Sequence, residues 1–477
     1  MICRQIKFML GALVSPFFLL TTSLVSLPCH ASPPNLLIIL TDDQGYHDVG
    51  FNGSKDIPTP NLDSIASNGV QFSSGYAAGP LSSSSRAGLL TGLYPQRFGY
   101  DLGSAWQPEN IKGGLPLGRT TLADFLGNAG YYCGAVGEWN LGVHPALRPL
   151  KRGFKDYFGI LGAGSCYFPE ELTILDPENI KSQYEVFHLS VWRDGRPKEI
   201  KNYLTDELSA EAAHFINRNK DRPFFLYLAY NAPHSPLEAT QKYLERFPDI
   251  ESPHRKTYAA MVSAVDDGVG CVLAELRKDG LEEKTLVVFL SDTGGSLDQN
   301  SSDNYPLRGA KGSPWEGGWR VPFVMQWPGH LPKGRVYEQP VISLDIFATM
   351  AAQVSVPSQA SLALDGVDLM PYLTGLKSGA PHDALFCTIP NSGGFAVRSG
   401  NYKLVNSGDG SPDKLYDVAA DIAESKDLAE SQSAVLATME QKWAVWNRSL
   451  PDPVDVPSAL ALPAGNNSPP LITGRNN

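Results

Sequence analysis

Three unbroken apolar runs, at residues 35–40, 223–230 and 285–290, set the strongest constraint on how this chain of 477 residues folds. Runs of this kind, rich in β-branched and aromatic residues, predict strands that are buried on both faces, as in a parallel sheet. Capped helical patterns at 204–218 and 258–280 precede two of these runs. Alternating helices and buried strands are typical of α/β proteins. We therefore predict a doubly wound, mostly parallel sheet flanked by helices.

The amino-terminal residues 1–31 have the pattern of a secretory signal peptide. Arg4 and Lys7 precede an apolar segment that ends in the small-residue site Cys29-His30-Ala31, which is the usual order of such leaders. After cleavage we expect no membrane span, because no later segment offers about 18 unbroken apolar residues. The pattern predicts a periplasmic or secreted protein.

The rest of the chain divides by composition into two domains and a tail. Residues 32–375 contain the alternating helices and buried strands, and form the larger predicted domain. Residues 376–449 instead show short alternating strands followed by an acidic helix, which predicts a small antiparallel α+β domain. Residues 450–477 are rich in Pro, Asn and Gly and are expected to be loosely ordered.

The charge of the chain excludes one class of partner. The formal net charge is −11, and removing the leader would take away two further cations. Nucleic acid is therefore not an expected partner. An anionic substrate would have to be attracted by local cations, because the overall field repels it.

Polar residues follow the predicted buried strands at the point where each strand ends. They are Asp42 and Asp43, Glu138 and Asn140, His234, and Asp292. Open α/β sheets bind ligands at the carboxyl edge of their strands, so we expect these side chains to converge on one site.

Asp42, Asp43 and Asp292 would place three carboxylates together at this edge. Without a neutralising partner each would raise the pKa of the others, and an oxygen-only ligand set favours Ca²⁺ or Mg²⁺. Adjacent aspartates at a strand end are also common as caps and turn formers. That second interpretation stays open for the Asp42-Asp43 pair.

The stretch at residues 79–92 has a polar, serine-dense turn, then Arg86, and then the small apolar run at 87–90, which predicts the first turns of a helix. Backbone N–H groups and the helix dipole favour an anion at such a start. The alternative is a serine-capped helix with a solvated arginine. Lys311 lies in a glycine-rich loop, and His234 lies between two prolines that fix its backbone; alone, each is equally compatible with an ordinary surface residue.

Taken in order, these segments resemble the type I sulfatases of the alkaline phosphatase superfamily. The stretch from Ser82 to Gly92 fits the family signature Cys/Ser-x-Pro-Ser-Arg-x-x-x-Leu-Thr-Gly, with Arg86 and Thr91-Gly92 in register. Further matching segments are TDDQGY (41–46), TLADFLGNAGYYCGAVGEWNLG (121–142), RGFKDYFGILG (152–162), APHSP (232–236), SDTGG (291–295), PLRGAKGSPWEGGWRVP (306–322) and KLYDVAADIAESKDLA (414–429).

The resemblance implies an arylsulfatase-like sulfuric ester hydrolase and assigns roles to single residues. Ser82 matches the position that is oxidised to formylglycine (3-oxoalanine) by a sulfatase-maturating enzyme, and whose hydrate attacks sulfur. Arg86 matches the cation that supports the formylglycine, Lys311 a cation on the sulfate, and His234 a proton donor or sulfate ligand. The implied ligands of one Ca²⁺ are Asp42, Asp43, Asp292, the modified residue 82, and Thr293 in the last ligand position.

Four positions depart from the family pattern. Ser84 replaces the signature proline, and Thr293 replaces an asparagine ligand of the metal. Glu138 stands where a lysine normally contacts sulfate, and Asn140 where a histidine normally stands. Losing a histidine acid would lower the rate by roughly 10²–10⁴-fold.

Three functions follow as hypotheses. The first is an active, divergent sulfatase of sulfated polysaccharides or oligosaccharides, in which Glu138 binds or protonates a group on the sugar and His234 or Lys311 acts as the acid. The second is a secreted pseudo-sulfatase that binds a sulfated ligand without turnover. The third is a phosphatase or phosphonate hydrolase of the same superfamily. We favour the first, because the cations and all three aspartates are present together.

Overall fold

The computed structural model describes residues 33–103, 106–182, 184–354, 362–390 and 392–452, and the backbone of residues 472–475. The predicted leader at 1–31 and most of the predicted tail at 450–477 lie outside the described residues. The described residues belong to one compact unit. The division of this unit into domains at residue 375 stays a prediction.

A ten-stranded sheet forms the centre of the fold, with strand order β12-β2-β11-β10-β1-β8-β4-β5-β6-β7. The strands from β10 to β5 in this order run parallel; β11 and β6 pair antiparallel to the two ends of this set, and the remaining strands extend the sheet beyond them. The bounds are β1 (Asn35–Thr41), β2 (Val70–Phe72), β4 (Tyr132–Glu138), β5 (Asp156–Ile160), β6 (Val191–Arg193), β7 (Arg196–Lys198), β8 (Phe224–Ala229), β10 (Thr285–Ser291), β11 (Phe323–Gln326) and β12 (Arg335–Tyr337).

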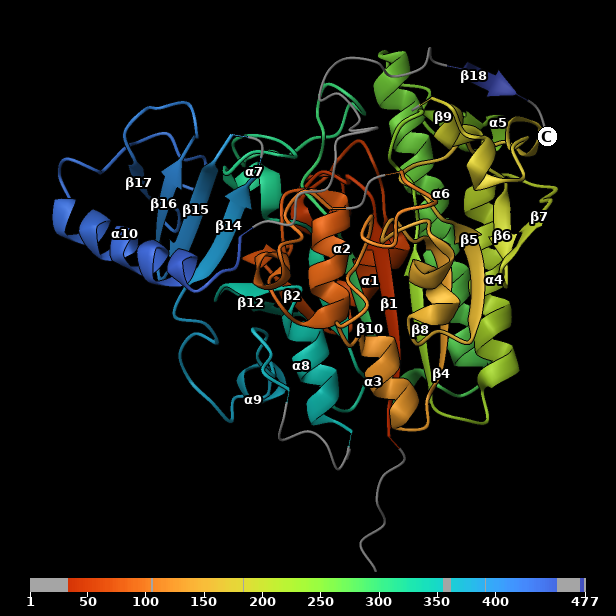
Figure 1. Cartoon of the computed structure of the whole chain (residues 1–477), viewed down its shortest axis with the longest axis horizontal. Coiled ribbons are helices and arrows are strands. Elements are labelled where there is room, and N and C mark those ends of the chain that lie inside the picture. The colour runs from red at the N-terminus through yellow and green to blue at the C-terminus, as the bar shows by residue number, and fades with distance from the viewer. Residues whose placement is uncertain are drawn as a thin grey trace, which may run out of the picture. The chain divides into compact units, whose positions relative to one another are not determined.

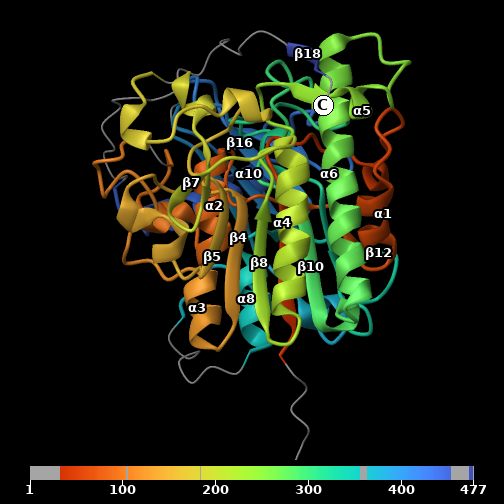
Figure 2. The same cartoon turned by 90° about the vertical axis from the view of Figure 1, so that its right-hand side faces the viewer.

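Helices cover both faces of this sheet, as Figures 1 and 2 show, and the predicted fold class is confirmed. Side chains from one set of helices pack with the even-numbered residues of β1 in one core, and those of the other set pack with Leu37 and Ile39 in a second core. The first set is α2 (Ser82–Thr91), α3 (Leu122–Asn128) and α8 (Asp345–Ala352); the second is α1 (Pro60–Ser67), α4 (Leu204–Asn219) and α6 (Pro253–Lys278).

The register of β1 brings the strand ends together. Leu40 pairs with Leu290 of β10 and with Ala229 of β8, so all three strands end at the same edge. Every residue of β1 is buried, as its continuous apolar sequence predicts. The first residues beyond these strands are therefore neighbours in space, although they are far apart in the chain.

A second, four-stranded antiparallel sheet follows, in the order β14-β15-β16-β17, with α10 packed against it (Figure 1). The bounds are β14 (Leu385–Ile389), β15 (Gly394–Ser399), β16 (Tyr402–Asn406), β17 (Lys414–Asp417) and α10 (Ser433–Arg448). Buried Lys403 of β16 reaches out of this sheet to Glu316, at 3.0 Å, and to Glu424, at 2.9 Å. Glu316 belongs to the short helix α7 (Glu316–Trp319), just after the loop that carries Lys311.

Short elements complete the described chain. They are β3 (Gly75–Tyr76) paired with β13 (Val341–Ile342), β9 (Glu238–Thr240) paired with β18 (Ile472–Arg475), α5 (Gln241–Leu244) and α9 (Met370–Leu373). No helix among the described residues is long and apolar enough to span a bilayer. The four cysteines in this part of the chain, Cys133, Cys166, Cys271 and Cys387, are free thiols.

Candidate active site

Ser82 is the first residue of α2, and its side chain faces the carboxyl edge of the sheet. Its Oγ donates to Asp42 Oδ1 at 3.1 Å, and Lys311 Nζ donates to the same Oγ at 3.2 Å. Leu81 precedes the helix, and its side chain makes no capping hydrogen bond. The alternative of a serine-capped helix is therefore wrong, and the hydroxyl of Ser82 instead lies between a carboxylate and an ammonium group.

Arg86 follows Ser82 by one helical turn and is 0% exposed, so it is not a solvated arginine. Its Nε donates to Asp292 Oδ2 and its Nη2 to Asp42 Oδ2, each at 2.9 Å. Burial alone would lower the pKa of Arg86, but Glu138, Asp292 and Asp42 raise it well above its ordinary value. Arg86 is thus a permanent cation that joins the ends of β1, β10 and β4.

Glu138, the last residue of β4, lies beside Arg86 and is 1% exposed. Its Oε1 is 3.3 Å from Arg86 Nη2, and its Oε2 accepts from the backbone N–H of Gly164 at 2.8 Å. This carboxylate therefore neutralises Arg86 and holds the loop at Gly164. Whether it also contacts a substrate stays a prediction.

This geometry predicts the effect of restoring a lysine at position 138. We expect Glu138→Lys to lower the free energy of unfolding by about 3–5 kcal/mol, because it sets a second buried cation against Arg86. Glu138→Gln is the control, since it keeps an acceptor for Gly164 and should cost much less. Chemical denaturation measures both. A Glu138→Lys variant as stable as the wild type, with tighter binding of inorganic sulfate, would show that the side chain faces the pocket instead.

Asp43 is held by three donors from the segment between β10 and α7. Lys311 Nζ lies 2.6 Å from Asp43 Oδ1, and Thr293 Oγ1 donates to the same oxygen at 2.8 Å. Ser296 Oγ donates to Oδ2 at 2.6 Å. Burial would raise the pKa of Asp43, but Lys311 and then His234 lower it below its ordinary value. Asp43 is therefore an ionised carboxylate at the centre of the site.

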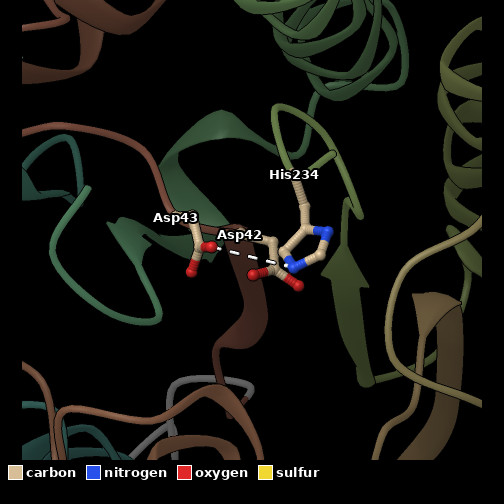
Figure 3. A group of neighbouring side chains, drawn as sticks. All are labelled: Asp42, Asp43 and His234. Carbon is tan, nitrogen blue, oxygen red and sulfur yellow. Dashed lines mark ion pairs between the residues drawn. The ribbon is translucent and has the colours of Figure 1, made fainter. Parts of the chain in front are cut away.

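His234 lies in the turn that follows β8, and its ring points toward the two aspartates (Figure 3). Its Nδ1 is 2.5 Å from the carbonyl oxygen of Ser235. A carbonyl can only accept, so Nδ1 carries a hydrogen. The other nitrogen, Nε2, lies 3.7 Å from Asp43 Oδ2 and is the ring atom directed into the site.

Asn140 and Ser84 take part through different contacts. Asn140 has a φ of 50°, and its carbonyl oxygen accepts from Ser83 Oγ at 2.7 Å, which ties the end of β4 to the start of α2. Ser84 Oγ donates to the carbonyl oxygen of Leu81 at 3.1 Å, within the helix. The structure thus brings all the predicted site residues into one connected set, while their roles stay predictions.

The donor set fits a divalent cation. The ligand atoms of Asp42, Asp43 and His234 lie within 4.8 Å of one another. Asp292 stands beside this group, with Oδ2 on Arg86 and Oδ1 3.3 Å from the backbone N of Asp43. Burial, followed by the charges of Asp292 and Glu138, raises the pKa of Asp42 well above its ordinary value. By formal charge, the four carboxylates of Asp42, Asp43, Asp292 and Glu138 exceed the two fixed cations, Arg86 and Lys311, by two, and a bound divalent cation would offset that excess.

Three further residues of the site have no clear signal in the sequence. Ser296 contacts Asp43, Gly164 contacts Glu138, and Asn304 binds the loops around Lys311. Each lies in a loop of ordinary composition. The position of Ser296 directly after SDTGG is the one feature that could have indicated it.

Comparison with known proteins places this site in context. A family model described as Sulfatase matches residues 34–356. N-acetylgalactosamine-6-sulfatase of Canis lupus familiaris is 36% identical over 361 residues, which cover 72% of this chain and 66% of that protein. Arylsulfatase A of Homo sapiens is 35% identical over 395 residues, which cover 78% of this chain and 75% of that protein.

A solved structure is also similar over most of the chain. The crystal structure of Ps i-CgsB in complex with k-i-k-neocarrahexaose is 37% identical, with a TM-score of 0.83, over 89% of this chain and 94% of that one. The first of the curated relatives is matched over just under two thirds of its own length, 66%.

Proposed function

We propose, because this chain belongs to the sulfatase family, that it is an active sulfatase that hydrolyses sulfate esters of a polysaccharide or oligosaccharide. The predicted enzyme class, an arylsulfatase-like sulfuric ester hydrolase, is that of the family. The observation that carries the proposal is the position of Ser82 Oγ, 3.1 Å from Asp42 Oδ1 and 3.2 Å from Lys311 Nζ. A group formed at this position would meet both a cation site and a sulfate-binding ammonium.

We further propose that Ser82 is oxidised to formylglycine. The conversion removes two hydrogens from the CH₂OH group and needs an external oxidant, which a radical-type sulfatase-maturating enzyme of the native host would provide. The aldehyde hydrate carries two hydroxyl groups on one carbon: one can attack sulfur, and the other can lose its proton to re-form the aldehyde and expel the bound sulfate, which the single hydroxyl of an unmodified serine cannot do. Ser84 in place of the signature proline bears on recognition by that enzyme.

Asp42, Asp43 and Asp292 would hold one Ca²⁺, with Thr293 and residue 82 close enough to complete its ligands. This assignment rests on the excess of negative charge and on the oxygen-rich donor set. When bound, the ion supplies positive charge next to residue 82 and stabilises negative charge that develops on the sulfate. Thr293 Oγ1, which now donates to Asp43, can turn its lone pairs toward a cation.

The fixed cations of the chain have separate tasks in this proposal. Arg86 is fully enclosed by carboxylates, so it orients Asp42 and Asp292 and does not contact sulfate. Lys311 reaches the Ser82 hydroxyl and is 20% exposed, so it is the ammonium group that can bind a sulfate oxygen. His234, with Nε2 directed into the site, is the group that can pass a proton to the departing alcohol.

We infer that the substrate contains a sulfated sugar of galacto configuration. Two similar proteins support this choice: one is named N-acetylgalactosamine-6-sulfatase, and the other was solved with a neocarrahexaose, a carrageenan fragment. The leader pattern at residues 1–31 supports a periplasmic or secreted location, where such polysaccharides are encountered.

A pseudo-sulfatase that binds a sulfated ligand is the second candidate. The pairing of Glu138 with Arg86 favours it, because Arg86 is then occupied by carboxylates and Lys311 is, among the residues described, the one cation that contacts the Ser82 side chain. A phosphatase or phosphonate hydrolase is the third candidate, and it would use the same set of groups.

Turnover on a matched panel of esters separates these candidates. Protein from the native host is assayed on sulfated carrageenan oligosaccharides, galactosamine 6-sulfate, glucosamine 6-sulfate and an aryl phosphate. We expect sulfate release from one or both galacto substrates, and at least about tenfold less from glucosamine 6-sulfate. Binding without turnover of any sulfate would support the pseudo-sulfatase, and faster turnover of the phosphate would support the third candidate.

A further inference from the structure

Asn304 is buried, 2% exposed, in the segment between Asp292 and Lys311. Its Oδ1 accepts from the backbone N–H of Tyr46 at 3.2 Å and from that of Gly295 at 3.0 Å. Tyr46 belongs to the loop that follows Asp42 and Asp43, and Gly295 to the loop that follows Asp292 and Thr293. One oxygen therefore ties together the two loops that carry the aspartates.

The amide nitrogen of the same side chain binds the loop that carries Lys311. Nδ2 lies 3.0 Å from the carbonyl oxygen of Gly295 and 3.1 Å from those of Gly309 and Gly317. The Gly295 carbonyl also accepts from the backbone N–H of Lys311 at 3.1 Å. Asn304 Nδ2 and the backbone N–H of Lys311 therefore donate to the same carbonyl oxygen. This shared acceptor fixes the position of the Lys311 backbone relative to the loop that follows Asp292.

The backbone around the Asn304 side chain is closely packed. A Cβ at Gly317 would lie 2.4 Å from the Gly309 carbonyl oxygen, and a Cβ at Gly295 would lie 2.9 Å from Asn304 Oδ1. The backbones thus approach as near as glycine permits, and the three carbonyl oxygens converge on one amide. Without that amide, the Gly309 and Gly317 carbonyl oxygens would lose this donor, and Gly295 would keep only the backbone N–H of Lys311.

We infer that Asn304 is a positioning residue that couples the cation site to the sulfate-binding lysine: it sets Lys311 and the Asp43 and Asp292 loops in one fixed arrangement. The inference rests on the proposed function for the roles of Lys311 and the aspartates. It predicts that the cation and sulfate bind cooperatively, because both depend on the same three loops. Partners of this kind that orient ligands typically change metal affinity by about 10–100-fold.

The test measures binding to the full-length chain, without turnover, using Ca²⁺ alone and inorganic sulfate with and without Ca²⁺. Asn304→Ala is expected to lower the affinity for Ca²⁺ and the affinity for sulfate by about tenfold or more each, and to remove the effect of Ca²⁺ on sulfate affinity. Asn304→Asp keeps the acceptor but replaces the N–H donors with a second oxygen, which repels the carbonyl oxygens around it. We therefore expect it to lower the affinity for sulfate more than Asn304→Ala does. This second variant also serves if Asn304→Ala does not fold.

Asn219→Ala is the matched control for a merely structural role. Asn219 is equally buried and bonds Phe215 and Arg222 at the end of α4, at the opposite edge of the sheet. The Asn219→Ala substitution should lower the melting temperature while leaving the affinities for Ca²⁺ and for sulfate unchanged. Folded Asn304 variants that bind both ions like the wild type would overturn the inference. A wild type that binds both ions but turns over no ester would overturn the proposed activity alone, and one that binds neither ion would overturn both.

Discussion

Ser82→Ala is expected to abolish sulfate ester hydrolysis, with a loss of about 10⁴-fold or more in kcat. The side chain supplies the carbon that becomes the aldehyde, so no neighbouring group can replace it. Its Oγ bonds Asp42 and Lys311. When this hydroxyl is removed, Asp42 keeps its ion pair with Arg86, and Lys311 keeps its ion pair with Asp43. The variant should therefore fold normally. Initial rates on the best ester of the panel measure the effect.

Ser84→Ala is the matched control for this loss. Ser84 lies in the same turn of α2, and its Oγ donates to the Leu81 carbonyl oxygen, so its variant should keep turnover within a few-fold once residue 82 is modified. If Ser82→Ala keeps a rate close to that of the wild type, the nucleophile lies elsewhere and the assignment fails.

Asp292→Asn is expected to reduce the affinity for Ca²⁺ at least about 100-fold. The change removes one of the carboxylates that give the site its negative excess, while the amide keeps the shape of the side chain. It also leaves Arg86 Nε facing an amide group in place of its 2.9 Å carboxylate partner. Calorimetry on chelated protein should show one calcium site in the wild type and no measurable heat in the variant.

Asp266→Asn is the control here, because Asp266 is also buried but accepts from the first turn of α1, at Asn61 and Leu62. It should bind Ca²⁺ like the wild type. Equal and weak uptake by the wild type and by Asp292→Asn would mean that the aspartates are structural caps, and the calcium site would be rejected.

The central strands could be predicted because burial on both faces leaves a continuous apolar run. β1 and β10 match the expected residues 35–40 and 285–290 to within one residue. β5, β6 and β7 carry no such run: β7 is exposed at every residue, and β5 contains Asp156 and Gly159. Helix α6 begins at Pro253, before the expected residue 258, because Ser252 Oγ caps it by accepting a hydrogen bond from the backbone N–H of Arg255.

The site was predictable to the extent that its residues stand at strand ends or in motifs. Asp42, Asp43, Asp292 and His234 meet because parallel strands share a carboxyl edge. The partners of Arg86 and Glu138 were not predictable, because these contacts join residues that are distant in the chain and leave no local pattern. The same holds for Asn304, whose role depends on carbonyl groups that any sequence possesses.

The central claim, that residue 82 is the modified nucleophile of an active sulfatase, is tested most directly by mass spectrometry of protein from the native host. The tryptic peptide that ends at Arg86 contains Ser82. We predict that it is lighter by two hydrogens, with the change localised to residue 82, and that the modified fraction tracks the rate of sulfate release. A fully intact serine in protein that hydrolyses a sulfate ester would contradict the claim, and an intact serine in inactive native protein would leave the pseudo-sulfatase.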